Sequence, residues 1–255
     1  MNQQKAILTS SIAEDLYQNL QQASYDEIFI LTDENTLKVC MPTLEKVKIF
    51  HQTIIITIPA NDNHKNLETL SAVWKVLSEK GGSRQSLLIN LGGGVVTDLG
   101  GFAASTFKRG ITYYNIPTTL LAMVDASMGG KTGINFLGLK NEIGVFNPPA
   151  KVWISTQFLK TLDQNNMLSG YAEMLKHGLI STEVHWNSLL SFDLEKIDYE
   201  KLQVLIGESI RIKETIVEQD PFERGIRKAL NLGHTIGHAF ESFALKENRG
   251  VYHDY

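Results

Sequence analysis

The sequence has few of the features that mark secreted, membrane-bound or nucleic-acid-binding proteins. Its single cysteine, Cys40, cannot form an internal disulfide and excludes a C-x-x-C metal site. No apolar run approaches the roughly 18 residues needed to cross a bilayer, and the first residues lack the pattern of a signal peptide. A net charge of −4 and a pI near 6.0 give no general attraction to nucleic acid. We therefore expect a soluble, cytoplasmic protein without membrane or nucleic-acid partners, in which any site for an anion is local.

The first half of the chain alternates strand and helix patterns. Short β-branched or apolar runs are separated by stretches with helical spacing, such as Leu70, Val73 and Leu77. This alternation predicts an α/β domain with a doubly wound, mostly parallel sheet, whose ligands bind beyond the carboxyl ends of the strands. The predicted strands are residues 27–31, 53–58, 86–91, 111–116 and 151–155.

The second half has a different character. From about residue 161, apolar residues recur at spacings of three and four, as at Leu202, Leu205, Ile206 and Ile210, which indicates successive helices. We predict an α/β domain over residues 1–158 and an all-α domain over residues 159–255, and we expect the active site in the cleft between them.

Three consecutive glycines, residues 92–94, follow the predicted strand at 86–91. Such a turn lets the backbone approach a ligand closely, and the helix expected from Leu99 to Phe107 would direct its free N–H groups at an anion. The usual motifs do not match, because Thr97 stands at the third glycine position of G-x-G-x-x-G and the P-loop pattern is absent. Taken alone, the glycines could simply form a tight turn between strand and helix.

Further polar groups follow the glycines within fifty residues of sequence. They comprise a Thr-Thr pair after Pro117, the acid Asp125, the run GGKTG at 129–133, and Lys140-Asn141. Lysine, asparagine and the bare amides of glycine-rich loops are the donors that grip a phosphate ester. This stretch predicts a phosphate-binding site.

Two histidines near the end of the chain, His234 and His238, are one helical turn apart and share a face. This spacing is typical of metal ligands, but Thr235 occupies the glutamate position of the zinc-protease pattern H-E-x-x-H. From spacing alone, a metal site and two solvated or packed histidines remain alternatives.

Several motifs, in order, resemble 3-dehydroquinate synthases: GGGVVTDLGGF, IPTTLLAMVDASMGGKTGIN, LKNEIGVF, GYAEMLKHG and RKALNLGHTIGHAFES. The resemblance implies conversion of 3-deoxy-D-arabino-heptulosonate 7-phosphate to 3-dehydroquinate and phosphate. The implied steps are transient oxidation by NAD, phosphate elimination, re-reduction and aldol closure. It also implies a zinc or cobalt ion and a homodimer. Members of the family continue beyond the last residue of this sequence, so the resemblance implies that a C-terminal part is missing.

The resemblance assigns NAD binding to the strand ends and the glycine turn. Asp33 and Asn35 resemble the family's Asp-x-Asn, and an acid there favours NAD over NADP. Without the resemblance, Asp33 is more often a helix cap. A second family motif is altered here, where Asn61 and Asp62 replace glycine and glutamate. The implied cofactor-binding residues are Asp33, Asn35, Asp62, Lys65, Gly93, Gly94, Val95, Asp98, Thr118, Thr119, Asp125 and Lys140.

The resemblance also implies the metal and substrate residues. The implied zinc ligands are Glu173, His234 and His253, which leave a coordination position open as a catalytic zinc requires. Lys131, Asn141 and His238 resemble the phosphate side of the site. Lys176, Lys213, Arg227 and Asn231 resemble its polar wall and carboxylate clamp. Arg109 resembles an arginine that crosses a dimer interface to the neighbouring subunit's phosphate, and Glu223 resembles a supporting acid. Each lysine or arginine alone would be interpreted as a solvated surface charge.

Two other interpretations of the sequence stay open. Sugar-phosphate cyclases of the deoxy-inosose or valiolone type share this scaffold, as do polyol and glycerol phosphate dehydrogenases more distantly. Lys213, Arg227 and Asn231 favour a substrate with a carboxylate and so separate these classes. A truncated, inactive binding protein is the alternative from a different functional class.

Overall fold

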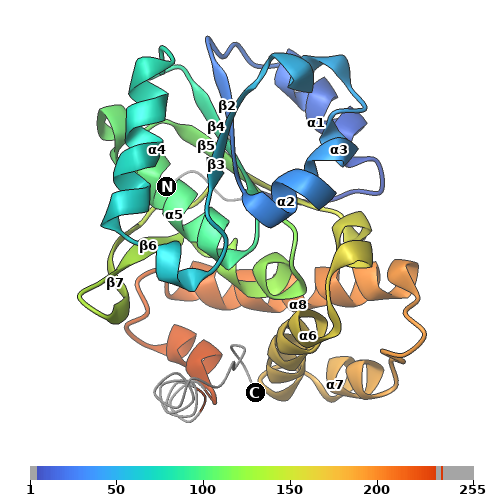
Figure 1. Ribbon diagram of the computed structural model, residues 1–255. Helices are drawn as coiled ribbons and strands as arrows, with labels where there is room; N and C mark the ends of the chain where they lie inside the picture. The colour runs from blue at the N-terminus through green and yellow to red at the C-terminus, as the bar shows by residue number, and fades with distance from the viewer. Residues whose placement is uncertain (1–4, 234–236, 238–255) are drawn as a thin grey trace.

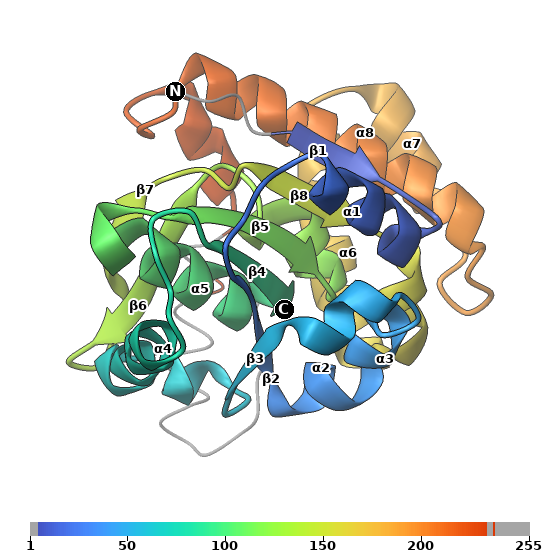
Figure 2. The same ribbon diagram turned by 90° about the horizontal axis from the view of Figure 1, so that it is seen from above.

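The computed structural model describes residues 5–233 and residue 237 of the chain. Its α/β part is a six-stranded parallel sheet in the order β1-β8-β5-β4-β2-β3, visible from above in Figure 2. The strands are β1 (Lys5–Leu8), β2 (Ile28–Asp33), β3 (Ile54–Ile58), β4 (Leu87–Gly92), β5 (Thr112–Pro117) and β8 (Lys151–Ile154). The helices among them are α1 (Ile12–Gln21), α2 (Glu34–Val39), α3 (Met41–Leu44), α4 (Leu67–Glu79) and α5 (Gly94–Thr106). This arrangement confirms the predicted doubly wound α/β fold.

The part that follows β8 is helical in the described residues and lies below the sheet in Figure 1. It contains the short helix η5 (Thr156–Thr161), then α6 (Gln164–Leu179), α7 (Glu183–Leu190), α8 (Tyr199–Gln219) and η6 (Ile226–Asn231). The predicted all-α character of this part is confirmed, while the division into two domains at residue 158 stays a prediction. None of the described helices is both long enough and apolar enough to cross a membrane.

The sheet separates two apolar cores, and each central strand contributes to both. Ile30 and Ile89 face the core that also contains residues of α1, α6 and α8. Leu31 and Leu88, their neighbours in sequence, face the core made with α4 and α5. Alternation along a strand sends successive side chains to opposite faces, so burial on both faces explains why these strands are apolar throughout.

The point where the chain changes direction in the sheet lies between β2 and β4. These strands are neighbours, yet the chain leaves β2 toward the outer strand β3 and leaves β4 toward β5 on the other side. Thr36, in α2, donates from Oγ1 to the Leu91 carbonyl at 3.3 Å and joins the two strand ends. In open α/β sheets, ligands bind in the crevice formed at such a point.

Three local predictions were incomplete. Helix α5 begins at Gly94, five residues before the predicted Leu99, because two glycines are enough to make the turn after β4. The run at 129–133 and Lys140-Asn141, predicted to belong to glycine-rich phosphate-binding loops, lie mostly in an antiparallel hairpin of β6 (Lys131–Phe136) and β7 (Leu139–Phe146). The elements β1 and α1 were not predicted.

Candidate active site

The glycine turn lies at the carboxyl end of β4, at the point where the chain changes direction in the sheet. Gly92 ends β4 and Gly93 is the N-cap of α5, where no side chain caps the helix. The first N–H groups of an α-helix have no partner within the helix, so this end of α5 can bind an anion. A Cβ on Gly93 would lie 3.1 Å from Cγ2 of Thr119, and the amide of Thr118 donates to the Gly92 carbonyl at 3.0 Å. The predicted residues 93, 94, 118 and 119 therefore lie together.

Asp33 lies at the end of β2, the strand beside β4, and caps helix α2. Its Oδ1 accepts the amides of Asn35 at 2.8 Å and Thr36 at 2.9 Å, and Thr36 Oγ1 accepts the Asp33 amide in return. The helix-cap interpretation of Asp33 is thus confirmed. A contact of Asp33 with NAD stays a prediction, and the geometry leaves Oδ2 with no hydrogen bond to the described residues.

Lys65 is a buried cation next to α5. Only 4% of the residue is exposed, and its Nζ donates to Asp98 Oδ2 and to Asn141 Oδ1, both at 2.5 Å. Burial raises the pKa of Asp98 above its ordinary value, although the charge of Lys65 acts in the opposite direction. Asn141, which was grouped with Lys131 on the phosphate side, thus contacts Lys65, one of the predicted cofactor-binding residues.

The altered motif at Asn61-Asp62 is tied to the β6–β7 hairpin. Asn135, in β6, donates from Nδ2 to Asp62 Oδ2 at 3.0 Å, and Lys140 Nζ lies 3.7 Å from the same oxygen. Asn135 also accepts the amide of Asn141 at 3.0 Å. The predicted residues Asp62, Lys65, Asp98 and Lys140 therefore form one connected group beside the glycine turn.

Asp125 connects the glycine turn to the helical part. It lies in a π-helical turn, η4 (Ala122–Ala126), and a Cβ on Gly94 would lie 3.4 Å from the Cβ of the adjacent Ala126. Lys213, in α8, donates to the Asp125 carboxylate and, at 2.7 Å, to its main-chain carbonyl. Burial acts to raise the pKa of Asp125, but the charges of Lys213 and Lys176 outweigh it and lower this pKa. Burial in turn lowers the pKa of Lys213.

Glu173, the described member of the implied zinc ligands, is buried in α6. Its Oε1 lies 2.6 Å from Lys176 Nζ and 3.3 Å from His177 Nε2, yet neither approach has hydrogen-bond geometry. Lys176 instead donates to the Leu230 carbonyl at 2.5 Å. The Lys176 ammonium compensates part of this buried charge, and the oxygen without a hydrogen bond can accept a further partner such as a metal ion.

The other implied zinc ligands, His234 and His253, lie outside the described residues, as does His238. Within residues 5–233, no group of three His, Cys, Asp or Glu side chains is arranged to hold a metal. His177 is completely buried, and neither ring nitrogen has a hydrogen-bond partner among the described residues. No sequence signal distinguished it.

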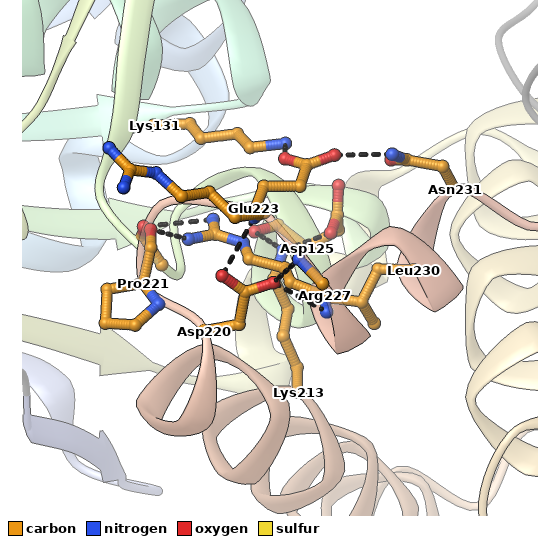
Figure 3. Close-up of polar contacts among 12 residues, drawn as sticks. Asp125, Lys131, Lys213, Asp220, Pro221, Glu223, Arg227, Leu230 and Asn231 are labelled. Atoms are coloured by element: carbon orange, nitrogen blue, oxygen red, sulfur yellow. Dashed lines mark hydrogen bonds and ion pairs between the residues drawn. The ribbon is translucent and has the colours of Figure 1, made fainter.

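Arg227 is buried and bound to main-chain carbonyls. Only 2% of the residue is exposed, and its guanidinium donates to Pro221 at 2.6 Å and to Gly129 at 3.1 Å (Figure 3). It thereby fixes the turn at 129–130, just before β6, against the segment that follows α8. Its predicted place in a carboxylate clamp stays a prediction, since the described guanidinium contacts are to the protein itself.

Lys131 and Asn231 both contact a third residue, Glu223. One oxygen of the Glu223 carboxylate pairs with the Lys131 ammonium, and the other accepts a hydrogen bond from the Asn231 amide (Figure 3). Sequence analysis grouped Glu223 only as a supporting acid. Its bridging position depends on how the segment after α8 folds back, which no local pattern indicates.

Four basic side chains around η4, β6 and the segment after α8 are each close to an acidic side chain in the described residues. Each basic side chain lies near an acidic one, and the numbers of the two kinds are equal. The basic members are Lys131, Lys176, Lys213 and Arg227, and the acidic members are Asp125, Glu173, Asp220 and Glu223.

Two features lie away from this cluster. Arg109 is exposed in the turn η3 (Phe107–Arg109), at the opposite end of α5 from the glycine turn. Its predicted action on a neighbouring subunit stays a prediction. An open groove of about 660 Å³ lies between β1 and α8, bordered by Leu8 and Val204, and contains none of the predicted site residues.

Comparison with known proteins identifies the family. Residues 55–169 match the family described as 3-dehydroquinate synthase N-terminal, and residues 170–253 match 3-dehydroquinate synthase C-terminal. The chain is 52% identical to 3-dehydroquinate synthase of Parabacteroides distasonis over 253 residues, 99% of this chain and 72% of that protein. The chain belongs to the 3-dehydroquinate synthase family. It is also 40% identical to the enzyme of Streptococcus pyogenes, covering 92% of this chain and 66% of that one. The chain thus spans about two thirds to three quarters of the length of these synthases.

Solved structures of related cyclases share the fold. A 2-deoxy-scyllo-inosose synthase complexed with carbaglucose-6-phosphate, NAD⁺ and Co²⁺ has a TM-score of 0.86 at 22% identity, over 94% of this chain and 67% of that one. The 2-epi-5-epi-valiolone synthase of Streptomyces hygroscopicus, with NAD⁺ and Zn²⁺ bound, has a TM-score of 0.85 at 25% identity, over 94% and 68%. The dehydroquinate synthase-like fold predicted from the motifs is therefore confirmed.

Proposed function

We propose that this chain carries the catalytic site of a 3-dehydroquinate synthase. The reaction would convert 3-deoxy-D-arabino-heptulosonate 7-phosphate to 3-dehydroquinate and phosphate. Membership of the synthase family supports it, and one structural observation carries it: η4 lies between the glycine turn and the cations of α6 and α8. Gly94 approaches Ala126, and the adjacent Asp125 pairs with Lys213. The groups proposed for NAD and for substrate thus border one crevice.

NAD would lie across the ends of β2 and β4. The bare amides at Gly93 and Gly94 suit its pyrophosphate, and Asp33 Oδ2 suits a ribose hydroxyl. The related cyclases with NAD⁺ bound support this cofactor. When bound, NAD supplies a reversible hydride acceptor for one substrate hydroxyl.

A divalent metal, zinc or cobalt, would be held by Glu173 with His234 and His253. The unsatisfied Glu173 Oε1 fits this role, and the Zn²⁺ and Co²⁺ of the related cyclases support it. When bound, such a metal lowers the pKa of a coordinated hydroxyl. Lys176, beside Glu173, would keep the surroundings of that carboxylate cationic.

The substrate's anionic groups would be held by residues around the hairpin and the segment after α8. Lys131 is half exposed and can reach a phosphate, with His238 expected nearby. Lys213 and Asn231 would contribute to the polar wall and the carboxylate clamp. The pair of Asp125 and Lys213 would hold a charged donor at a fixed place between cofactor and substrate, which positions the reacting carbon against NAD.

We further propose that the protein acts as a cytoplasmic homodimer, in which Arg109 reaches the phosphate bound by the other subunit. Arg109 is exposed and lies at the far end of α5 from its own glycine turn, so a role in its own crevice is hard to reconcile with this position. Measuring the molar mass in solution and complementing Arg109→Ala with a subunit that lacks Lys131 would test this arrangement.

A second candidate is another sugar-phosphate cyclase, because the chain shares its fold with inosose and valiolone synthases. These alternatives are separated by assaying phosphate release from the heptulosonate phosphate and from uncarboxylated sugar phosphates. We expect release only from the carboxylated substrate, dependent on NAD and abolished by a chelator. Absence of release from the complete protein with both cofactors would contradict the proposal.

Two variants test the proposed roles individually. Lys131→Ala should lower turnover at least about tenfold, equivalent to roughly 1.4 kcal/mol of transition-state stabilisation. His234→Ala should abolish retention of zinc, measured as metal content after purification. Unchanged phosphate release in the first variant, or a full equivalent of zinc in the second, would remove that residue from the site.

A further inference from the structure

Glu223 already places an anion between two proposed substrate-binding side chains. Its carboxylate pairs with Lys131 through one oxygen and accepts from Asn231 through the other (Figure 3). Lys131 begins β6 and Asn231 ends η6, so the two donors come from segments far apart in the sequence. The contact therefore occupies the groups that a substrate phosphate or carboxylate would need.

The backbone around Glu223 is fixed independently of these contacts. Glu223 has a φ of 56°, in the left-handed region that favours glycine. Asp220 stabilises this turn, because its carboxylate accepts the amides of Arg224 at 2.9 Å and Gly225 at 2.6 Å. Because the Asp220 carboxylate fixes the main chain of this turn, the Glu223 side chain can leave Lys131 by rotating alone, without rearrangement of the loop.

The charge on Glu223 competes with an incoming anion for the same donors. Burial acts to raise its pKa, but the hydrogen bonds from Lys131 and Asn231 outweigh it and lower this pKa, so the carboxylate is charged at neutral pH. The nearby Arg227 is bound to main-chain carbonyls. Glu223 engages both Lys131 and Asn231, so a phosphate that binds to these two donors must compete with its carboxylate.

We infer that Glu223 is an internal anion that occupies Lys131 and Asn231 before substrate arrives and is displaced by the substrate's phosphate. The inference rests on the proposed function, in which Lys131 binds phosphate. Half of the Lys131 side chain is exposed, whereas Glu223 is 18% exposed, so an incoming anion can approach the ammonium directly. A phosphate dianion interacts more strongly with an ammonium than a carboxylate monoanion does, so the exchange favours dianionic ligands. Glu223 thereby lowers the affinity for phosphate. It also favours ligands that carry two negative charges over ligands that carry one.

The test is the affinity of the full chain for inorganic phosphate, measured by calorimetry at about pH 8, where phosphate is mostly dianionic. Glu223→Gln removes the competing charge and should bind phosphate about fivefold more tightly than the unmodified protein. Glu195→Gln is the matched control, because it removes the same charge from an exposed loop and should leave the affinity unchanged. In a Lys131→Met background, Glu223→Gln should give no gain.

Three results would overturn the inference. Phosphate could bind equally well or more weakly to Glu223→Gln, the control could gain as much, or the gain could persist without Lys131. If Glu223→Gln does not fold, Glu223→Asp decides, because its shorter side chain cannot bridge both donors and should give a smaller gain. These affinities are independent of catalysis, so absence of phosphate release from the sugar phosphate would contradict the proposed function alone.

Discussion

The two sides of the crevice are built by different means. On the proposed nucleotide side, the glycine turn and the α2 cap are each formed within a few residues of sequence, and only the neighbouring Lys65 contacts depend on distant segments. On the substrate side, Lys213 reaches back 88 residues to Asp125, and Asn231 meets Lys131 through Glu223. The first is a local consequence of the chain, and the second depends on the packing of distant segments.

This difference predicts which kind of substitution destabilises each side. A surface made of main chain is sensitive to added atoms, because nothing in it can rotate away. A cluster of paired charges is sensitive to removed atoms, because the partner that remains is a buried charge. Four measurements can break or sharpen the comparison.

The largest expected effect is on the substrate side. Asp125→Ala leaves the Lys213 ammonium, with 6% of its side chain exposed, without a carboxylate and should lower the free energy of unfolding by about 3 kcal/mol. Asp125→Asn keeps a hydrogen-bond acceptor of the same size and should lose about half as much. Urea denaturation of both variants measures this, and a loss below about 1 kcal/mol for Asp125→Ala would show that the pair contributes little.

The next largest effect is on the nucleotide side, where one added methyl group should be enough to destabilise the fold. A Cβ on Gly100, inside α5, would lie 2.0 Å from Oδ1 of Asn90 and 2.8 Å from Cδ2 of Leu31. Gly100→Ala should therefore cost about 2 kcal/mol of stability, even after the gain in helix propensity.

The matched control is Gly94→Ala in the first turn of the same helix. Its Cβ meets Ala126 at an ordinary 3.4 Å, so stability should be retained. NAD affinity should nevertheless fall, because the methyl group intrudes where the pyrophosphate is proposed to lie. Fluorescence titration with NADH measures that affinity, and equal losses of stability in the two variants would contradict the distinction.

The same contrast explains what sequence analysis could predict. The parallel sheet, the helical second part and the grouping around residues 92–119 followed from periodicity and short motifs, which encode structure locally. The hairpin at 131–146 was missed because its glycine-rich sequence also suits a phosphate loop. The contact of Asn141 with Lys65 and the Glu223 bridge could not be predicted, since they depend on side chains brought together only by the packed fold.

Asp33 allows stability and binding to be measured separately on the nucleotide side. Asp33→Ala loses the α2 cap and should cost about 1 kcal/mol of stability. Asp33→Asn keeps an oxygen that can accept the amides of Asn35 and Thr36, so stability should stay within about 0.5 kcal/mol of the original. If Asp33 also contacts ribose, both variants should lose NAD affinity, whereas unchanged affinity in Asp33→Asn would restrict Asp33 to its capping role.

The smallest effect concerns acid stability, where the two sides should differ in sign. Asp98, on the nucleotide side, has a pKa raised by burial above its ordinary 3.8, so the folded protein binds its proton first and acidification through that range favours the fold. Asp125, on the substrate side, has its pKa lowered by Lys213 and Lys176 against the effect of burial, so its contribution is lost as the pH falls below 3.8. Compared with the unmodified protein, Asp98→Asn should lose stability more steeply as the pH falls toward 3.8, and Asp125→Asn less steeply below 3.8. Urea denaturation across this range measures both slopes, each changing by less than about 1 kcal/mol because both carboxylates keep some solvent contact. Slopes that changed in the same direction would mean that charge pairing and burial act alike on the two sides.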